Sequence, residues 1–357
     1  MDLFRALPLP TGTEDGASKR LVQVVKAFES CFSRLPEGVA RAPGRVNLIG
    51  EHIDYEGYAV LPMAIEQSVY VAFNSIENSS KEGVKVLSVA NAKSQYKSIT
   101  LSMDENEQGI MEKLEQEGAT WAKYVLCGVL GIRDTYPELF KGQVAELQLL
   151  VDGDIPAGCA GCGLSSSSAL VVAAALAITS ALKTPGRELL CRSELAELCR
   201  RAEHRVGTMG GGMDQAVACL AQRGVALHLD FSSVPATSIP VNVPGAAAGV
   251  TFVVANSLVV AEKAVDAATR FNKRVVECAL AAKLIAKKSG IEDWRKITRL
   301  VDVQKALGEG VRFNELQKLA LSSCVLDEYS ISAIEEEFRE TIESLFHASS
   351  LEAAMKV

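Results

Sequence analysis

The stretch that decides the fold is DGDIPAGCAGCGLSSSSALVVAAALAITSALK, residues 152–183. Alternating apolar residues predict a strand over residues 144–156, and the alanine-rich run predicts a helix over residues 166–182. A strand, a glycine-rich turn and a helix leave backbone N–H groups and the positive end of the helix dipole aimed at one spot, which suits a phosphate. Small residues at a helix start also permit close helix–sheet packing. This stretch alone leaves both interpretations open.

A second polar segment, RAPGRVNLIGEHIDYEGY, covers residues 41–58. Its Arg41, Arg45, Glu51, His52 and Asp54 lie on either side of a short apolar run that predicts a strand. So many donors and acceptors in one loop suit a ligand with several hydroxyl groups, because each hydroxyl needs a partner when it leaves water. A solvated turn with local salt bridges is the alternative.

A third segment, EHRVGTMGGGMDQAVACLA, covers residues 203–221. Three glycines precede Asp214 at a predicted helix start, where backbone N–H groups and a nearby arginine would keep a carboxylate ionised. Such a carboxylate can orient a hydroxyl group and accept its proton. The alternative is an ordinary helix-capping aspartate.

Composition narrows the class of protein. The chain has 357 residues, more than the roughly 250–300 at which single cores stop growing, so we expect two lobes. Its net charge of −7 argues against general binding to nucleic-acid phosphates. The first 20 residues resemble neither a signal peptide nor a membrane anchor, and the nine scattered cysteines indicate small buried residues rather than disulfides. We therefore expect a cytoplasmic protein.

The remaining pattern predicts helices and strands on both sides of these segments. Helices are expected over residues 21–32, 123–136, 193–206 with Ser193 as N-cap, 264–288 and most of 296–357; strands are expected over 58–73, 224–233 and 249–260. Lys283, Lys287 and Lys288 indicate a solvated helix face. Cys159 and Cys162 have the spacing of a redox or zinc pair, but no second ligand pair accompanies them, so we do not expect such a site.

Together the three segments resemble the galactokinase branch of the GHMP small-molecule kinases. GRVNLIGEHIDYEGY (residues 44–58) is similar to the galactokinase signature, GLSSSSAL (163–170) to the phosphate-binding motif, and GGGMDQ (210–215) to the catalytic-aspartate motif. Their order and spacing also match, and the resemblance runs from about Arg41 to at least Leu284.

The resemblance implies a kinase that uses ATP and Mg²⁺ to phosphorylate the anomeric hydroxyl of galactose, with N-acetylgalactosamine as the alternative substrate. It implies Asp214 as catalytic base, and Arg45 as the residue that stabilises the transferring phosphoryl group and keeps Asp214 ionised. The implied sugar-binding residues are Arg45, Glu51, His52, Asp54, Gly211, Asp214 and Phe271. The implied ATP-binding residues are Gly161, Gly163, Leu164, Ser165, Ser166, Ser167, Ser168 and Lys263, and the implied Mg²⁺ ligands are Ser167 and Glu203.

The resemblance also implies an α+β protein with the two-lobed GHMP kinase fold and its active site in the cleft between the lobes. We expect lobes over residues 1–245 and 246–357, the second incomplete, because the family's glycine-rich motif G-[AS]-G-x-G-G does not occur before Val357. Six residues separate Pro156 from Gly163, where relatives usually have about three. A sugar- and ATP-binding regulator with weak phosphoryl transfer is therefore a further alternative. The expected partners are the sugar and ATP, without nucleic acid or membrane, for a monomer.

Overall fold

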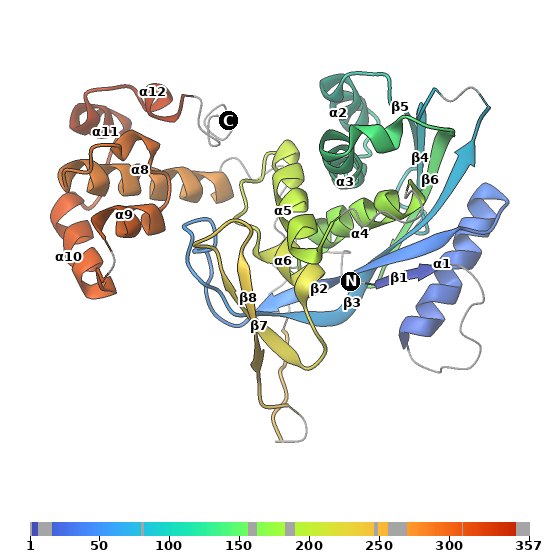
Figure 1. Cartoon of the computed structure of the whole chain (residues 1–357), viewed down its shortest axis with the longest axis horizontal. Coiled ribbons are helices and arrows are strands. Elements are labelled where there is room, and N and C mark those ends of the chain that lie inside the picture. Colours follow the sequence, from blue (N-terminus) through green and yellow to red (C-terminus); the bar gives the residue numbers. More distant parts are fainter. Residues whose placement is uncertain are drawn as a thin grey trace.

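The computed structural model describes residues 2–5, 16–79, 82–155, 163–182, 190–245, 249–255, 270–308 and 310–347 (Figure 1). The strands are β1 (Asp2–Arg5), β2 (Gly38–Asn47), β3 (Pro62–Glu77), β4 (Val86–Asn91), β5 (Ile99–Ser102), β6 (Val144–Gly153), β7 (Val225–Asp230) and β8 (Thr237–Asn242). The α-helices are α1 (Gly16–Phe32), α2 (Glu107–Gln116), α3 (Ala122–Thr135), α4 (Ser166–Ala181), α5 (Arg192–Glu203), α6 (Met213–Leu220), α8 (Asn272–Lys288), α9 (Leu300–Leu307), α10 (Phe313–Ser323), α11 (Ile331–Phe338) and α12 (Ile342–Phe346). Short 3₁₀ turns are η1 (Pro137–Phe140), η2 (His204–Val206) and η5 (Trp294–Lys296).

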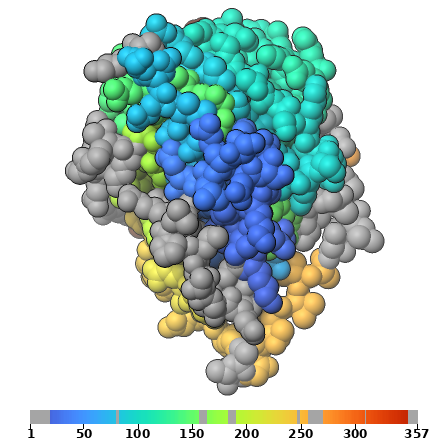
Figure 2. Space-filling view, turned by 90° about the vertical axis from the view of Figure 1, so that its right-hand side faces the viewer, coloured from blue at the N-terminus to red at the C-terminus, as the bar shows by residue number. Residues whose placement is uncertain are grey.

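Six strands form one sheet in the order β1-β2-β3-β6-β4-β5, in which β4 and β6 are parallel and the other neighbours are antiparallel. Strand β6 is buried along most of its length, as expected for a strand covered on both faces. Helix α1 packs on one face, and α3 and α4 cover the other (Figure 1). Figure 2 shows α1, in blue, across the outer face.

Helix α4 is apolar on nearly all sides because it is enclosed by α3 and by strands β2 and β3. Its alanines let neighbouring backbones approach closely. A Cβ atom added to Gly128 of α3 would lie 2.6 Å from the carbonyl oxygen of Val171. This packing holds the start of α4 beside β2, where the predicted phosphate-binding and sugar-binding segments meet.

Helices α8 to α12 form a second group with its own core, at the opposite end of the molecule from α1 (Figure 1). Leucine, isoleucine, alanine, valine, phenylalanine and tryptophan side chains form this core, and Tyr55 and Met209 from the first part of the chain also join it. Pairwise packing of amphipathic helices explains their arrangement. The predicted boundary between residues 245 and 246 falls between β8 and this group.

The solvated helix face predicted for the α8 lysines is wrong for Lys283 and Lys287, whereas Lys288 is exposed. Lys283 is fully buried and donates to the carbonyl oxygen of Arg295, while Lys287 donates to those of Glu337 and Phe338 at 2.8 and 3.1 Å. Lys287 thus meets carbonyl groups in the last turn of α11, which have no partner within their own helix. Lys283 and Lys287 therefore connect segments within the second group of helices through hydrogen bonds to carbonyl oxygens.

Three local predictions also need correction. The expected strand over residues 249–260 does not form in its described part, residues 249–255, where Val253 is 86% exposed; the rest lies outside the described residues. The N-cap of α5 is Cys191 rather than Ser193, and the carboxylate of Glu194 accepts from the Cys191 N–H at 2.9 Å. The strand predicted for the apolar run after Arg45 is also displaced, because β2 begins at Gly38, contains Arg41 and Arg45 and ends at Asn47. The other predicted elements appear near the expected positions where the structure describes them.

Candidate active site

The site is built around a pair of residues that lie 169 positions apart in the sequence. Nε of Arg45 on β2 donates to Oδ1 of Asp214 on α6 at 2.6 Å, and the two side chains are only 11% and 15% exposed. The guanidinium also donates from Nη1 to the carbonyl oxygen of Gly163 at 2.5 Å. One arginine therefore joins the predicted sugar-binding, phosphate-binding and catalytic-aspartate segments.

The backbone of β2 explains how Arg45 reaches this position. The register between β2 and β3 shifts between Pro43 and Arg45, and the Arg45 N–H donates to the carbonyl oxygen of Leu164 at 3.2 Å. A Cβ atom on Gly44 would lie 2.6 Å from that same oxygen. Glycine at position 44 thus lets the strand and the phosphate-binding segment pack in direct contact.

The glycines before α6 have a similar steric role. A Cβ atom on Gly211 would lie 2.3 Å from the backbone nitrogen of Tyr55 and 2.4 Å from the carbonyl carbon of Asp54. Gly212 has a φ of +112°, a backbone conformation that residues other than glycine rarely adopt. This turn brings Asp54 within reach of the Met213 N–H, which donates to its carboxylate at 3.4 Å.

Asp54 and Asp214 are close enough to interact electrostatically. Burial raises the pKa of Asp54, and the charge of Asp214 raises it further. Of the other predicted sugar-binding residues, Glu51 accepts from Nδ2 of Asn47 at 3.0 Å. The ring of His52 lies 5.4 Å from that of Phe271. Polar side chains and the ring of Phe271 thus lie together around the loop formed by residues 51–54.

The predicted phosphate-binding loop leads into the N-terminus of α4. Ser165 occupies the left-handed region with φ of 59° and is 4% exposed, and its Oγ atom has no hydrogen-bond partner among the described residues. Gly163, Leu164, Ser166 and Ser167 lie along the same loop and first turn. A helix N-terminus beside a buried hydroxyl is a donor set that phosphate oxygens can use. Gly161 and Lys263 lie outside the described residues.

A polar chain that sequence reasoning missed links α4, α5 and α6. Nε2 of Gln215 donates to the carboxylate of Glu203 at 2.6 Å and lies 3.4 Å from Oγ of Ser168. All three residues are buried. Gln215 directly follows Asp214 in the same motif, which was the available signal. The predicted metal ligand Glu203 therefore lies near the first turn of α4, which also carries Ser167.

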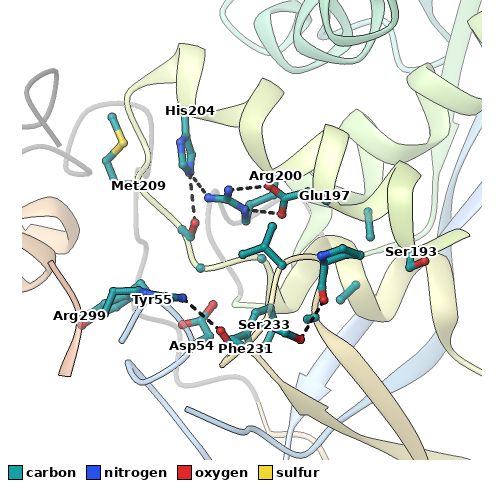
Figure 3. A pocket seen from close by; sticks show the side chains of 18 of the residues that line it. Asp54, Tyr55, Ser193, Glu197, Arg200, His204, Met209, Phe231, Ser233 and Arg299 are labelled. Carbon is teal, nitrogen blue, oxygen red and sulfur yellow. Dashed lines mark hydrogen bonds and ion pairs between the residues drawn. The ribbon is translucent and has the colours of Figure 1, made fainter. Parts of the chain in front are cut away.

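A pocket of about 260 Å³ opens beside this site (Figure 3). Asp54 and Gly211 line it together with Glu197, Arg200 and His204. Their side chains and backbone form a chain of contacts: Arg200 donates twice to Glu197 at 2.7 and 2.8 Å, and Nε2 of His204 lies 3.2 Å from the carbonyl oxygen of Gly210. Burial lowers the pKa of His204, so its neutral imidazole can donate to that carbonyl. These contacts hold the glycine turn before α6 in place through the carbonyl oxygen of Gly210.

Two structural features bear on other expectations. Among the described residues, no helix is both long enough and apolar enough to cross a bilayer. The seven cysteines in the described ranges are all free, whereas Cys159 and Cys162 lie outside them.

Comparison with known families agrees with this geometry. Residues 123–222 match the GHMP kinases N terminal domain, and residues 26–75 match the galactokinase galactose-binding signature. The solved structure of Lactococcus lactis galactokinase complexed with galactose superposes with a TM-score of 0.52 at 19% identity, covering 94% of this chain and 79% of that one. The α+β fold is therefore that of the GHMP kinases.

Curated relatives narrow the assignment within that class. The chain is 38% identical over 315 residues to the galactokinase of Dictyostelium discoideum, covering 85% of this chain and 58% of the relative. It is 34% identical over 198 residues to the galactokinase of Candida maltosa, covering 55% of this chain and 85% of the relative. The chain belongs to the galactokinase family. It spans 58% and 51% of the length of the Dictyostelium and Schizosaccharomyces pombe relatives.

Proposed function

We propose that the protein transfers the terminal phosphoryl group of ATP to the anomeric hydroxyl of galactose, which gives galactose 1-phosphate and ADP. The observation that carries the proposal is the pair formed by Arg45 and Asp214, which also contacts Gly163 of the phosphate-binding loop. Curated relatives named galactokinase support the choice of galactose.

In this proposal Asp214 orients the attacking hydroxyl and accepts its proton late in the reaction. Arg45 holds that carboxylate ionised through its Nε–H and places positive charge beside the transferring group. Phosphoryl transfer passes through a loose transition state, so alignment and charge stabilisation do most of the work. Glu51, His52 and Asp54 bind sugar hydroxyls, and Phe271 offers the sugar an apolar surface.

The phosphates of ATP are assigned to the N-terminus of α4, where the buried hydroxyl of Ser165 offers a polar partner. Ser167 and Glu203 supply a hydroxyl and a carboxylate, donors that suit Mg²⁺ together with phosphate oxygens. When bound, Mg²⁺ neutralises charge that develops on the phosphates. The first 245 residues would form the sugar- and phosphate-binding lobe, and the protein would act as a cytoplasmic monomer.

A coupled ADP-release assay on the 357-residue chain tests the proposal, with galactose, N-acetylgalactosamine or no sugar added. Galactose-dependent release is expected, and preference for N-acetylgalactosamine would replace the substrate. Asp214→Asn should lower kcat about 10²- to 10⁴-fold, as expected for loss of a general base. Asp293→Asn is the matched control, because the side chain of this exposed aspartate pairs with Lys296 at the surface, away from the site. Binding of galactose and ATP without turnover would refute the enzyme and favour a regulator.

A further inference from the structure

Tyr55 lies between the sugar-binding loop and helix α8. The residue is 8% exposed, and its hydroxyl lies 3.0 Å from Nδ1 of His52. Its ring meets Phe271 edge-on, at 5.8 Å and 79°. Cys278 on α8 lies near the same phenol and helps to raise the pKa of Tyr55. His52 itself is exposed. The buried Tyr55 therefore contacts the Nδ1 edge of the imidazole, and the rest of the ring remains accessible to a ligand.

The number of protons decides how these three groups are connected. A phenol carries one proton, which it can donate either to the imidazole nitrogen or to the sulfur. Nitrogen is the stronger acceptor, since sulfur accepts hydrogen bonds only weakly. The phenol therefore donates to Nδ1 of His52. Burial raises the pKa of Tyr55, so the phenol retains its proton at neutral pH.

A neutral imidazole that accepts at Nδ1 carries its proton at Nε2. The backbone of His52 further restricts the ring, because its φ of 59° places the residue in the left-handed region. The Nε2–H group is then a fixed donor in a loop whose other sugar-binding side chains, Glu51 and Asp54, are carboxyl groups.

We propose that Tyr55 is a positioning residue that holds His52 in the tautomer protonated at Nε2, so that the imidazole donates a hydrogen bond to a sugar hydroxyl oxygen. The inference rests on the proposed sugar site. A hydroxyl that donates to a carboxylate while it accepts from this N–H satisfies both groups at once. Replacing Tyr55 would leave the carboxylates in place but allow the other tautomer, which presents an acceptor where the hydroxyl needs a donor.

Tyr55→Phe removes the phenol oxygen and keeps the ring. We expect the KM for galactose to rise about tenfold, as for loss of one well-aligned hydrogen bond, with kcat and the KM for ATP within about twofold of the unmodified chain. Tyr58→Phe is the matched control, because the Tyr58 hydroxyl is buried and has no hydrogen-bond partner among the described residues. An equal rise in the galactose KM for both variants would overturn the proposal.

The tautomer can be measured without turnover. The chain has four histidines, so side-chain ¹⁵N correlation spectra, with His52→Gln to assign the signal, identify the protonated nitrogen of His52. The unmodified chain should show the Nε2–H form, and Tyr55→Phe should show a mixture. A proton at Nδ1 in the unmodified chain would overturn the inference even if the variant does not fold. Failure of galactose-dependent ADP release would instead refute the proposed function, because the spectra do not depend on it.

Discussion

Glu56 provides a stability test with a calculable magnitude. It is 3% exposed, and its Oε2 atom accepts from the N–H of Leu300 at 2.8 Å, at the first residue of α9. The carbonyl oxygen of Glu56 accepts from the Val301 N–H at 3.2 Å. Through these contacts Glu56 attaches the sugar-binding loop to the second group of helices.

Burial raises the pKa of Glu56 from 4.5 to about 7, although the Leu300 N–H and Arg299 oppose the change. A folded-state pKa above the unfolded value means that the folded protein binds the proton more tightly. The stabilising contribution is complete below pH 4.5 and is lost as pH rises through 7. At about 1.4 kcal/mol per pKa unit, Glu56 lowers the free energy of unfolding by roughly 2.5 kcal/mol between pH 5 and pH 8.

Glu56→Gln retains an oxygen that can accept from Leu300 and removes the ionisation. We compare the free energy of unfolding of the variant with that of the unmodified chain at each pH. The difference between them should change by roughly 2.5 kcal/mol in favour of the variant when the pH rises from 5 to 8. Urea unfolding followed by Trp294 fluorescence reports on the relevant core, with Trp121→Phe removing the second of the two tryptophans.

Glu292→Gln is the control for this experiment, because it removes an exposed carboxylate on the same group of helices. Its effect on the free energy of unfolding should be the same at both pH values. If Glu56→Gln also differs from the unmodified chain by a constant amount, burial does not govern the ionisation of Glu56 and the reasoning fails.

Two further substitutions test the phosphate-binding region. Gly44→Ala should weaken ATP binding at least tenfold in a fluorescent-nucleotide titration, because its Cβ would lie 2.6 Å from the Leu164 carbonyl oxygen; Gly142→Ala, which meets nothing within 4 Å, should leave ATP affinity unchanged. Gln215→Leu takes a hydrogen bond from the buried Glu203 carboxylate and should lower the free energy of unfolding by about 1–3 kcal/mol in urea titrations. An unchanged unfolding midpoint would show that other contacts of Glu203 suffice.

Elements with strong local patterns were predictable from the sequence. The apolar run of α4 and the apolar residues of β6 are local patterns that specify a helix and a strand. The strand expected over residues 249–260 does not form in its described part, residues 249–255, because β-propensity produces a strand only where a neighbouring strand supplies hydrogen bonds. Lys283 was misassigned because its burial depends on carbonyl groups that other segments bring to it.

For the candidate site, the sequence by itself determined the family and three groups of residues with the chemistry of sugar and phosphate binding. Only the tertiary structure brought Arg45 to 2.6 Å from Asp214, aligned Tyr55 with His52 and connected Gln215 to Glu203. Motifs record which side chains are present. Distances, burial and hydrogen-bond partners depend on how distant segments pack, and the sheet with its enclosed helix α4 decides that packing.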